Sequence, residues 1–308
     1  MKKVIITYCL LIFSLGYAQQ ESMFNHYMFN TQIFNPGYVG SSQSYSFNLI
    51  QRNQWVGFEG APVLQALSFS SPVQSKRLAY GITAISDRIG PIVNSSFAAD
   101  LAYHLLLNDN NRVLSLGLKM SLNSFNLDGE GLNLNQPGDP LFYSESVGFK
   151  PNIGTGIYYY TEKFYAGLST PFFFENKELR QNRHFYLTSG FLIDISRDFK
   201  LRPSGIIKMT SGAPVNLDFS NLFIYKDQFW LGANIRSTYR DLFPNQNTGG
   251  GFGAIFGVNV SNSLMVSYAY SYSLGNQTGV YNNGTHEIIL RYNLRQVAKA
   301  LIDSPRYF

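Results

Sequence analysis

Apolar and polar residues alternate along most of the chain with a period of two. Between residues 114 and 122, leucine and methionine take the even positions, while small or polar residues, Lys119 among them, take the odd positions. The same alternation recurs in residues 229–237 and 266–273. Because successive side chains of a β-strand point to opposite faces of a sheet, this pattern predicts strands with one apolar and one polar face.

Fourteen segments of the chain carry this pattern, and most are close to the ~9–11 residues that a tilted strand needs to cross a bilayer. An even strand number is typical of closed single-chain bacterial barrels, and twelve or sixteen strands stay as alternatives because segment ends are defined only to a few residues. The predicted fold is an all-β, transmembrane antiparallel β-barrel of the outer membrane. Its segments are 44–51, 64–71, 78–86, 94–106, 112–124, 149–161, 163–170, 184–196, 198–209, 214–225, 227–238, 251–260, 262–273 and 284–294.

The composition favours this barrel over a soluble β-sandwich. The chain holds 25 Phe and 21 Tyr, and only 14% of its residues are charged. In a sandwich, the apolar faces of two sheets would have to bury that aromatic surface against each other. A membrane barrel instead places it on the outer wall and in girdles at the two interfaces. The formal charge of +5 comes without a basic cluster, so it gives no argument for nucleic-acid binding.

The first residues have the order of a secretory signal peptide. Lys2 and Lys3 precede an apolar run, and small residues follow up to Ala18, so residues 1–18 are predicted to be removed. A transmembrane anchor is the alternative, but the run is shorter than the ~20 residues that a spanning helix needs. The only cysteine, Cys9, lies in this peptide, so the mature chain is expected to have no disulfide and no cysteine-based metal site.

Connections between the segments alternate in length. The connections after even-numbered segments are short and polar, as in residues 161–163 and 226–227. Those after odd-numbered segments are long, and residues 211–213 are a short exception; the long ones are residues 52–63, 125–148, 171–183, 239–250 and 274–283. In outer-membrane barrels, short turns face the periplasm and long loops face the exterior. Both ends of the mature chain are therefore expected in the periplasm.

This orientation divides the chain into a leader or hatch at residues 19–43, a barrel at 44–294 and a C-terminal periplasmic tail at 295–308. The leader is rich in aromatic residues and asparagine, which disordered leaders lack. It is expected either to enter the lumen as a hatch or to pack under the periplasmic rim.

Catalytic and metal-binding motifs are not found. None of the four histidines belongs to an HExxH pair, and no serine lies in a GxSxG motif. The carboxylates of residues 125–148 could hold calcium, but their order matches no EF-hand spacing. We expect no enzyme activity, cofactor or metal ion. An outer-membrane hydrolase is a rival that would need a serine and a histidine to converge at the wall, for instance His184 or His286 near a serine at the outer rim.

Polar residues of the predicted strands are expected to pair inside the lumen. His104 shares a strand face with Asp100, and His286 adjoins Glu287, so both histidines are expected to make luminal hydrogen bonds. The charged residues expected to pair with one another in the lumen are Lys119, Asp194, Lys208, Arg236, Glu287 and Arg291.

Residues 52–62 contain side chains that a simple turn does not require. Turns are built from Gly, Asn, Asp and Pro, whereas this stretch adds four side chains suited to directional contacts, namely Arg52, Trp55, Phe58 and Glu59. One interpretation is an aromatic clamp that folds back onto the protein. The other is a docking surface, because loops on a rigid scaffold often carry function.

The stretch RNQWVGFEGAP at residues 52–62 resembles the RNQWxGFxGAP signature of the PorP/SprF family, outer-membrane proteins of the type IX secretion and gliding-motility system of Bacteroidetes. The resemblance covers essentially the whole mature chain, with one departure at residues 37–40, where the family more often has alanine. Further matching positions are Asn35-Pro36, Gly40, Asp87, Ile89-Gly90-Pro91, Tyr103-His104-Leu105, Gly212-Ala213-Pro214 and Thr285-His286-Glu287.

The resemblance implies a non-enzymatic barrel that docks on periplasmic and outer-membrane type IX secretion components and helps to export or anchor a specific large surface adhesin. The residues hypothesised to bind partners are Arg52, Trp55, Phe58 and Glu59 in the loop, and Phe24, Tyr27, Asn35 and Pro36 in the leader. The alternative function is a fourteen-stranded outer-membrane transporter for a hydrophobic or small ligand.

Overall fold

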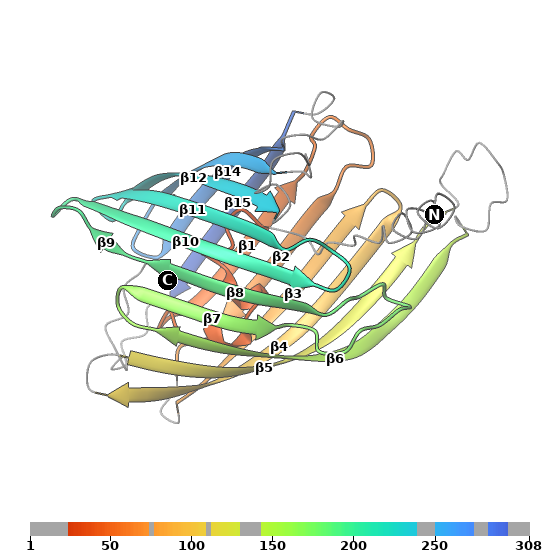
Figure 1. Cartoon of the computed structure of the whole chain (residues 1–308), viewed down its shortest axis with the longest axis horizontal. Coiled ribbons are helices and arrows are strands. Elements are labelled where there is room, and N and C mark those ends of the chain that lie inside the picture. Colours follow the sequence, from red (N-terminus) through yellow and green to blue (C-terminus); the bar gives the residue numbers. More distant parts are fainter. Residues whose placement is uncertain are drawn as a thin grey trace, which may run out of the picture.

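The computed structural model describes residues 24–73, 77–108, 112–129, 143–238, 250–273 and 283–294. These residues form one closed antiparallel barrel of fourteen strands, in which β8 and β9 are two parts of one strand interrupted at Leu192 (Figure 1). The strands are β1 (Tyr45–Asn53), β2 (Val63–Ser70), β3 (Leu78–Ile89), β4 (Ile92–Asn108), β5 (Arg112–Leu127), β6 (Glu145–Tyr160), β7 (Phe164–Thr170), β8 (His184–Phe191), β9 (Ile193–Asp194), β10 (Phe199–Thr210), β11 (Asn216–Tyr225), β12 (Phe229–Thr238), β13 (Gly251–Asn259), β14 (Leu264–Ser273) and β15 (Thr285–Leu294).

The barrel closes where the first strand meets the last. β1 pairs antiparallel with β15 along its whole length, from Tyr45 opposite Leu294 to Asn53 opposite His286. Closure removes the free sheet edges, whose backbone N–H and C=O groups could find no partner in a lipid bilayer. The predicted barrel class and the strand number of fourteen are therefore confirmed.

The wall follows the alternation read from the sequence. On β5, Leu118 and Met120 are 62% and 70% exposed, whereas Lys119 between them is 3% exposed. The exposed row is the apolar face that meets lipid, and the buried row lines the lumen. Among the described residues, no helix combines the length and the apolar character needed to cross a membrane.

Two connections differ from the predicted loop pattern. β3 continues to Ile89, beyond its predicted end, and β4 begins at Ile92, before its predicted start. A two-residue turn joins the two strands. Gly90 in this turn has a φ of +55°, in the left-handed region that glycine adopts without steric cost. We call the end of the barrel that carries this turn and residues 54–62 the loop end, and the opposite end the turn end.

Residues 171–183, predicted to be a long outer loop, fold inward at the loop end. β6 pairs with β7 only from Thr155 onward, so the first part of β6 extends beyond its neighbour. Residues 171–183 run beside this extension, where the Phe173 N–H donates to the Ile153 carbonyl at 2.7 Å. Leu179 then packs in a buried cluster with Phe125 and Leu127 on the inner face of β5.

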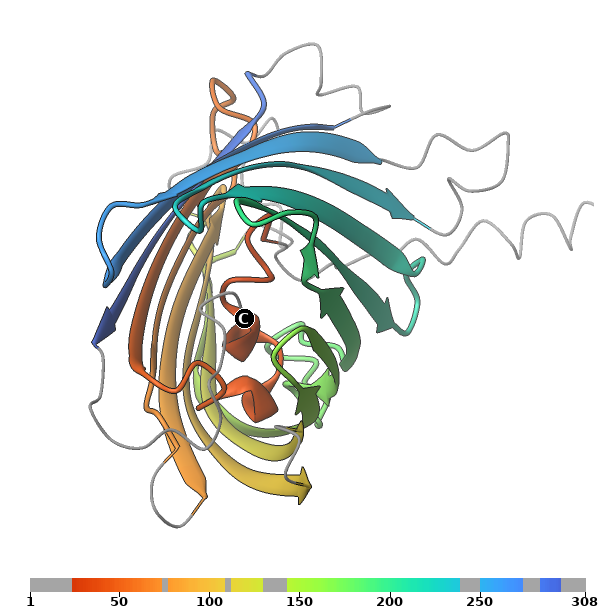
Figure 2. The same cartoon turned by 90° about the vertical axis from the view of Figure 1, so that its left-hand side faces the viewer.

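Residues 24–44, which we call the luminal segment, lie inside the ring of strands (Figure 2). The segment contains two short 3-10 helices, η1 (Thr31–Ile33) and η2 (Pro36–Tyr38). The Asn35 side chain accepts the Gly37 N–H at 2.8 Å and so caps η2, while Pro36 supplies a preset φ at the first helical position. The segment begins near the loop end and leads into β1 at the turn end.

The apolar outer wall predicts a strongly position-dependent response to charge. Met120→Lys, in the middle of β5, should lower the free energy of unfolding in lipid by about 2–4 kcal/mol, because the ammonium would enter the hydrocarbon. Asn126→Lys on the same face near the loop end is the control and should change it by less than about 1 kcal/mol. Denaturant unfolding in vesicles measures both, and equal effects would contradict the assignment of this face to lipid.

Candidate functional site

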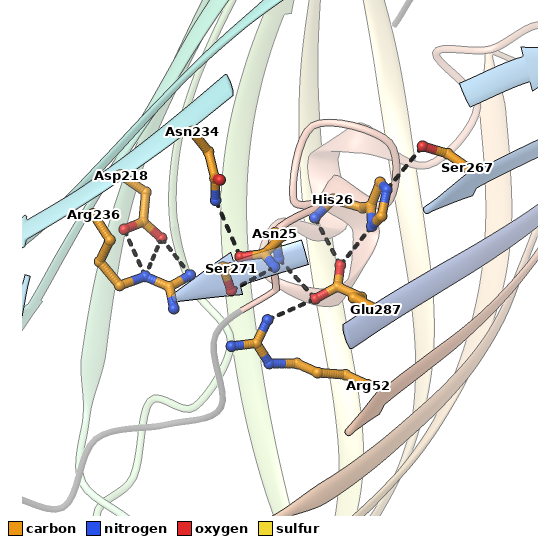
Figure 3. A network of polar contacts seen from close by, with 9 residues as sticks. All are labelled: Asn25, His26, Arg52, Asp218, Asn234, Arg236, Ser267, Ser271 and Glu287. Carbon is orange, nitrogen blue, oxygen red and sulfur yellow. Dashed lines mark hydrogen bonds and ion pairs between the residues drawn. The ribbon is translucent and has the colours of Figure 1, made fainter. Parts of the chain in front are cut away.

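One buried carboxylate joins the barrel seam to the luminal segment. Glu287 on β15 and Arg52 on β1 are register partners across the closing strand pair, and Arg52 Nη1 donates to Glu287 Oε2 at 2.8 Å. The backbone N–H groups of Asn25 and His26 also donate to the carboxylate, each at 2.8 Å (Figure 3). His26 Nδ1 lies 2.7 Å from Oε1. The Glu287 carboxylate therefore has a partner from β1 and three from the luminal segment.

The burial of this group explains why it needs so many partners. Glu287 is fully buried and Arg52 is 2% exposed. A buried charge that loses its water must be paired and hydrogen-bonded, and the loss of one partner from a buried ion pair costs about 3–5 kcal/mol. The four contacts therefore fix the start of the luminal segment against the seam.

A second polar group holds the same turn from strands next to β15 in the barrel order. The Asn25 side chain donates to Ser271 on β14 and accepts from Asn234 on β12, both at 3.1 Å. Beside them, Arg236 and Asp218 form a two-point ion pair between register partners on β12 and β11, at 2.9 and 3.0 Å (Figure 3). The turn is thus attached to β15, β14 and β12, which lie within one run of four neighbouring strands.

Further along, the luminal segment bonds to strands around the rest of the barrel. Tyr27 donates from its hydroxyl to the Ser204 carbonyl at 2.9 Å, and Arg202 donates to the Met28 carbonyl at 3.1 Å. Burial raises the pKa of the Tyr27 phenol well above its usual value, so Tyr27 stays a neutral donor.

Two more contacts lie on β4. Gln32 donates to Asp100, which pairs with Lys119 at 2.7 Å, and His104 Nε2 lies 2.8 Å from the Val39 carbonyl. These contacts place both predicted luminal residues of β4, Asp100 and His104, where the strand pattern expected them.

Three wall glycines make room for the turn at η2. A Cβ atom on Gly117 of β5 would collide with the backbone of Pro36 and Gly37. A Cβ atom on Gly156 or Gly167 would collide with the amide of Asn35. The strands β5, β6 and β7 therefore present a flat patch of backbone, and Asn35 also donates to the Ile157 carbonyl there at 3.0 Å.

Residues 54–62 form an ordered loop at the loop end. Its base closes where the Gln54 N–H donates to the Pro62 carbonyl at 2.9 Å. Val56 exchanges backbone hydrogen bonds with the segment before β15, and the Gly90 N–H of the β3–β4 turn donates to the Gly60 carbonyl. Trp55 is half-buried with a φ of +46°, a strained value for a bulky residue that such fixed surroundings impose.

The structure separates the eight predicted partner-binding residues into three settings. Phe58, 49% exposed, and Glu59 face solvent on the loop. Trp55 is half-buried in that loop, and Arg52 turns into the lumen to reach Glu287. The other four residues are buried within the barrel, namely Phe24, Tyr27, Asn35 and Pro36.

Sequence reasoning did not single out Asn25 and His26, although their backbone and side-chain groups carry the contact to the wall. No pattern in the neighbouring sequence points to them, because their partner Glu287 lies 261 positions from His26.

Two luminal assignments were wrong. His286 faces outward, where its Nδ1 lies 2.6 Å from the Tyr268 hydroxyl, because it alternates with the inward Glu287. Asp194 is exposed at the turn end and pairs with Lys163 at 2.6 Å, since β9 lies beyond the interruption at Leu192. The predicted signal peptide, the C-terminal tail and most of residues 125–148, 239–250 and 274–283 lie outside the described residues.

Within the part of the chain that the structure describes, no group of three or more His, Cys, Asp or Glu side chains is arranged to hold a metal ion. His184 Nδ1 lies 3.0 Å from the Asn182 carbonyl, and His286 contacts Tyr268 rather than a serine. The two histidines named for the rival hydrolase thus meet a backbone carbonyl and a tyrosine hydroxyl through their Nδ1 atoms.

The sequence matches the family described as type IX secretion system membrane protein PorP/SprF over residues 16–292. The chain belongs to this PorP/SprF family. No curated protein sequence matches it.

Among solved structures, the CymD monoaromatic hydrocarbon channel is similar, with a TM-score of 0.53 and 12% identity over 87% of this chain and 94% of that one. The Acinetobacter baumannii outer membrane protein Omp33 has a TM-score of 0.46 and 8% identity over 82% of this chain and 100% of that one. The likeness to CymD shows a shared barrel fold and nothing more. With the family membership, the barrel places this PorP/SprF protein in the outer membrane.

Four contacts meet at the Glu287 carboxylate, so its loss should most weaken the attachment of the luminal segment to the barrel wall. Glu287→Ala should lower the free energy of unfolding by about 3–5 kcal/mol and expose residues 24–44 to protease, because Arg52 is left buried without its partner. Glu162→Ala, at an exposed turn between β6 and β7, is the control. Denaturant unfolding and limited proteolysis measure the two effects; equal behaviour of the variants would show that the carboxylate does not anchor the segment.

The close contact between η2 and the glycines of β5, β6 and β7 gives a steric prediction. Gly117→Ala should push η2 away from β5 and lower the free energy of unfolding by about 1–3 kcal/mol, the usual range for an overpacked interior. Gly148→Ala on β6 is a matched control, because a Cβ atom there would meet nothing within 4 Å. If the thermal unfolding midpoints of both variants equal that of the parent, the close contact of η2 with the wall is refuted.

Proposed function

We propose that this PorP/SprF protein is a non-enzymatic component of the type IX secretion system that helps to export or anchor one large surface protein. The proposed docking surface is the loop of residues 54–62. The observation that carries the proposal is an exposed aromatic side chain, Phe58, on a loop whose backbone is fixed at three places.

A fixed loop suits recognition for a thermodynamic reason. Ordering a flexible loop on binding opposes association, and a loop held in advance avoids that loss. The loop base, the bonds of Val56 and the bond between Gly60 and Gly90 hold the backbone in this way. Phe58 beside the charged Glu59 offers the aromatic centre and polar rim typical of a binding hot spot.

The luminal segment has a different proposed role. Phe24, Tyr27, Asn35 and Pro36 are buried, so a partner could reach them only after the segment leaves the lumen. We therefore assign the docking of periplasmic secretion components to the turn end. Exposed ion pairs lie there, between Lys163 and Asp194 and between Lys200 and Asp227.

A transporter for a hydrophobic or small ligand is the alternative. It would use the same barrel fold as the CymD channel. The contacts of residues 24–44 with strands around the lumen oppose free passage, and a transporter would have to break them.

Co-purification from the native outer membrane tests the proposal. A tagged parent protein, extracted in mild detergent, should recover type IX components together with one very large surface protein. Phe58→Ala should weaken retention of that surface protein by about 2 kcal/mol, or roughly thirtyfold, as expected for an aromatic hot spot. Trp55→Ala should act in the same direction, because it removes a half-buried aromatic side chain from the same loop.

Phe173→Ala supplies the matched control, since Phe173 is also exposed at the loop end, at 44%. Mass spectrometry of the eluates gives the measurement. A parent barrel that elutes alone, and then takes up a small ligand in liposomes, would replace the proposal with the transporter.

A further inference from the structure

A cavity of about 430 Å³ lies between the luminal segment and residues 171–183 at the loop end. Its floor is made by buried apolar side chains of the luminal segment and of β2, including Phe24, Phe34 and Leu64. Ile89, which is 44% exposed, stands at its mouth beside the β3–β4 turn. This turn also bonds to the loop of residues 54–62, so the cavity adjoins the proposed docking surface.

Residues 171–183 form a fixed side of the cavity. Asn176 and Gln181 exchange backbone hydrogen bonds at 2.9 and 2.8 Å and close a tight turn. Asn152 on β6 donates to Gln181 at 3.0 Å, and Arg180 pairs with Glu145 at 3.3 Å. The cavity is therefore formed before any ligand arrives, as is usual for ligand pockets.

The lining defines the chemistry of an occupant. The apolar floor suits one bulky aliphatic or aromatic group. The sides carry the amides of Asn94, Asn123 and Asn182 with neighbouring serines, which are groups that hydrogen-bond to backbone N–H and C=O. Asp87 is the single carboxylate among the described lining residues, and the lining cation Arg180 is paired with Glu145, so the cavity does not select a strongly charged ligand.

We propose that this cavity binds a short, extended stretch of the exported polypeptide, which inserts one bulky apolar side chain toward Phe24 and Phe34. Its volume is near the lower end of the ~300–1,000 Å³ range of ligand pockets, so it holds a side chain with flanking backbone but not a helix ~10–12 Å across. The inference rests on the proposed function, because a secreted client supplies the polypeptide at this end of the barrel.

Thiol labelling of the purified barrel tests peptide binding directly. Asn94→Cys, combined with Cys9→Ala, places a single thiol in the cavity, and Val93→Cys places one on the opposite face of β4 as the control. The probes are acetyl-Gly-Phe-Gly-amide and acetyl-Gly-Ser-Gly-amide, added before a membrane-impermeant methanethiosulfonate. The phenylalanine peptide should slow labelling at position 94 about threefold at twice its dissociation constant, because one third of the sites is then free.

Position 93 should be unaffected, and the serine peptide should have no effect at either position. The proposal is overturned if the phenylalanine peptide does not protect position 94. It is also overturned if benzyl alcohol protects as well as the peptide does, because the cavity would then take small apolar molecules without using the backbone.

A second experiment in cells separates this inference from the proposed function. Deletion of the whole protein should deplete one large surface protein, which surface proteolysis and mass spectrometry would identify. Asn94→Trp should fill the cavity and lower that protein at least severalfold, whereas Val93→Trp, on the opposite face of β4, should leave it near the parental amount. If deletion changes no surface protein, the proposed function fails; if deletion depletes one and a folded Asn94→Trp barrel does not, only the cavity assignment fails.

Discussion

The rest of the structure depends on the requirement that the buried Glu287 carboxylate be fully paired. Arg52 contributes the opposite charge across the seam, but it donates to only one of the two carboxylate oxygens. The backbone N–H groups of Asn25 and His26 supply further donors, and those groups in turn need acceptors because they are buried away from any sheet. Barrel closure and insertion of the luminal segment therefore satisfy each other's polar groups, and neither arrangement is complete alone.

The same principle governs the lumen beyond the seam. Ion pairs between register partners recur at Asp100 with Lys119 and at Asp218 with Arg236. In both pairs, the charge on one strand is neutralised by a side chain of the neighbouring strand and not by the luminal segment. The luminal segment then uses mostly uncharged groups, such as the amide of Gln32 and the hydroxyl of Tyr27, to reach the wall.

The alternating pattern of the sequence was sufficient to predict the strands of the barrel. It was not sufficient to predict which segments fold into the lumen. Leu118 and Met120 were assigned to the lipid face correctly, because side-chain alternation is a local property of the strand. The same rule, applied strictly, would have placed His286 outside once Glu287 was placed inside. The inward fold of residues 171–183 could not be predicted, since it depends on how far β6 extends beyond the end of β7, which only the strand register defines.

The geometry of β1 relates the outer loop to the lumen. Arg52 at the end of this strand points inward to Glu287, and the loop begins two residues later at Gln54. The loop also bonds to residues 283 and 284 just before β15, so it follows Arg52 in the chain and is hydrogen-bonded to the segment that leads to Glu287. The Glu287 contacts that hold the start of the luminal segment therefore lie close to the Val56 contacts that help to fix the loop of residues 54–62. The signature at residues 52–62 thus serves both the interior of the barrel and its exterior, which accounts for its mixture of a buried arginine with an exposed phenylalanine.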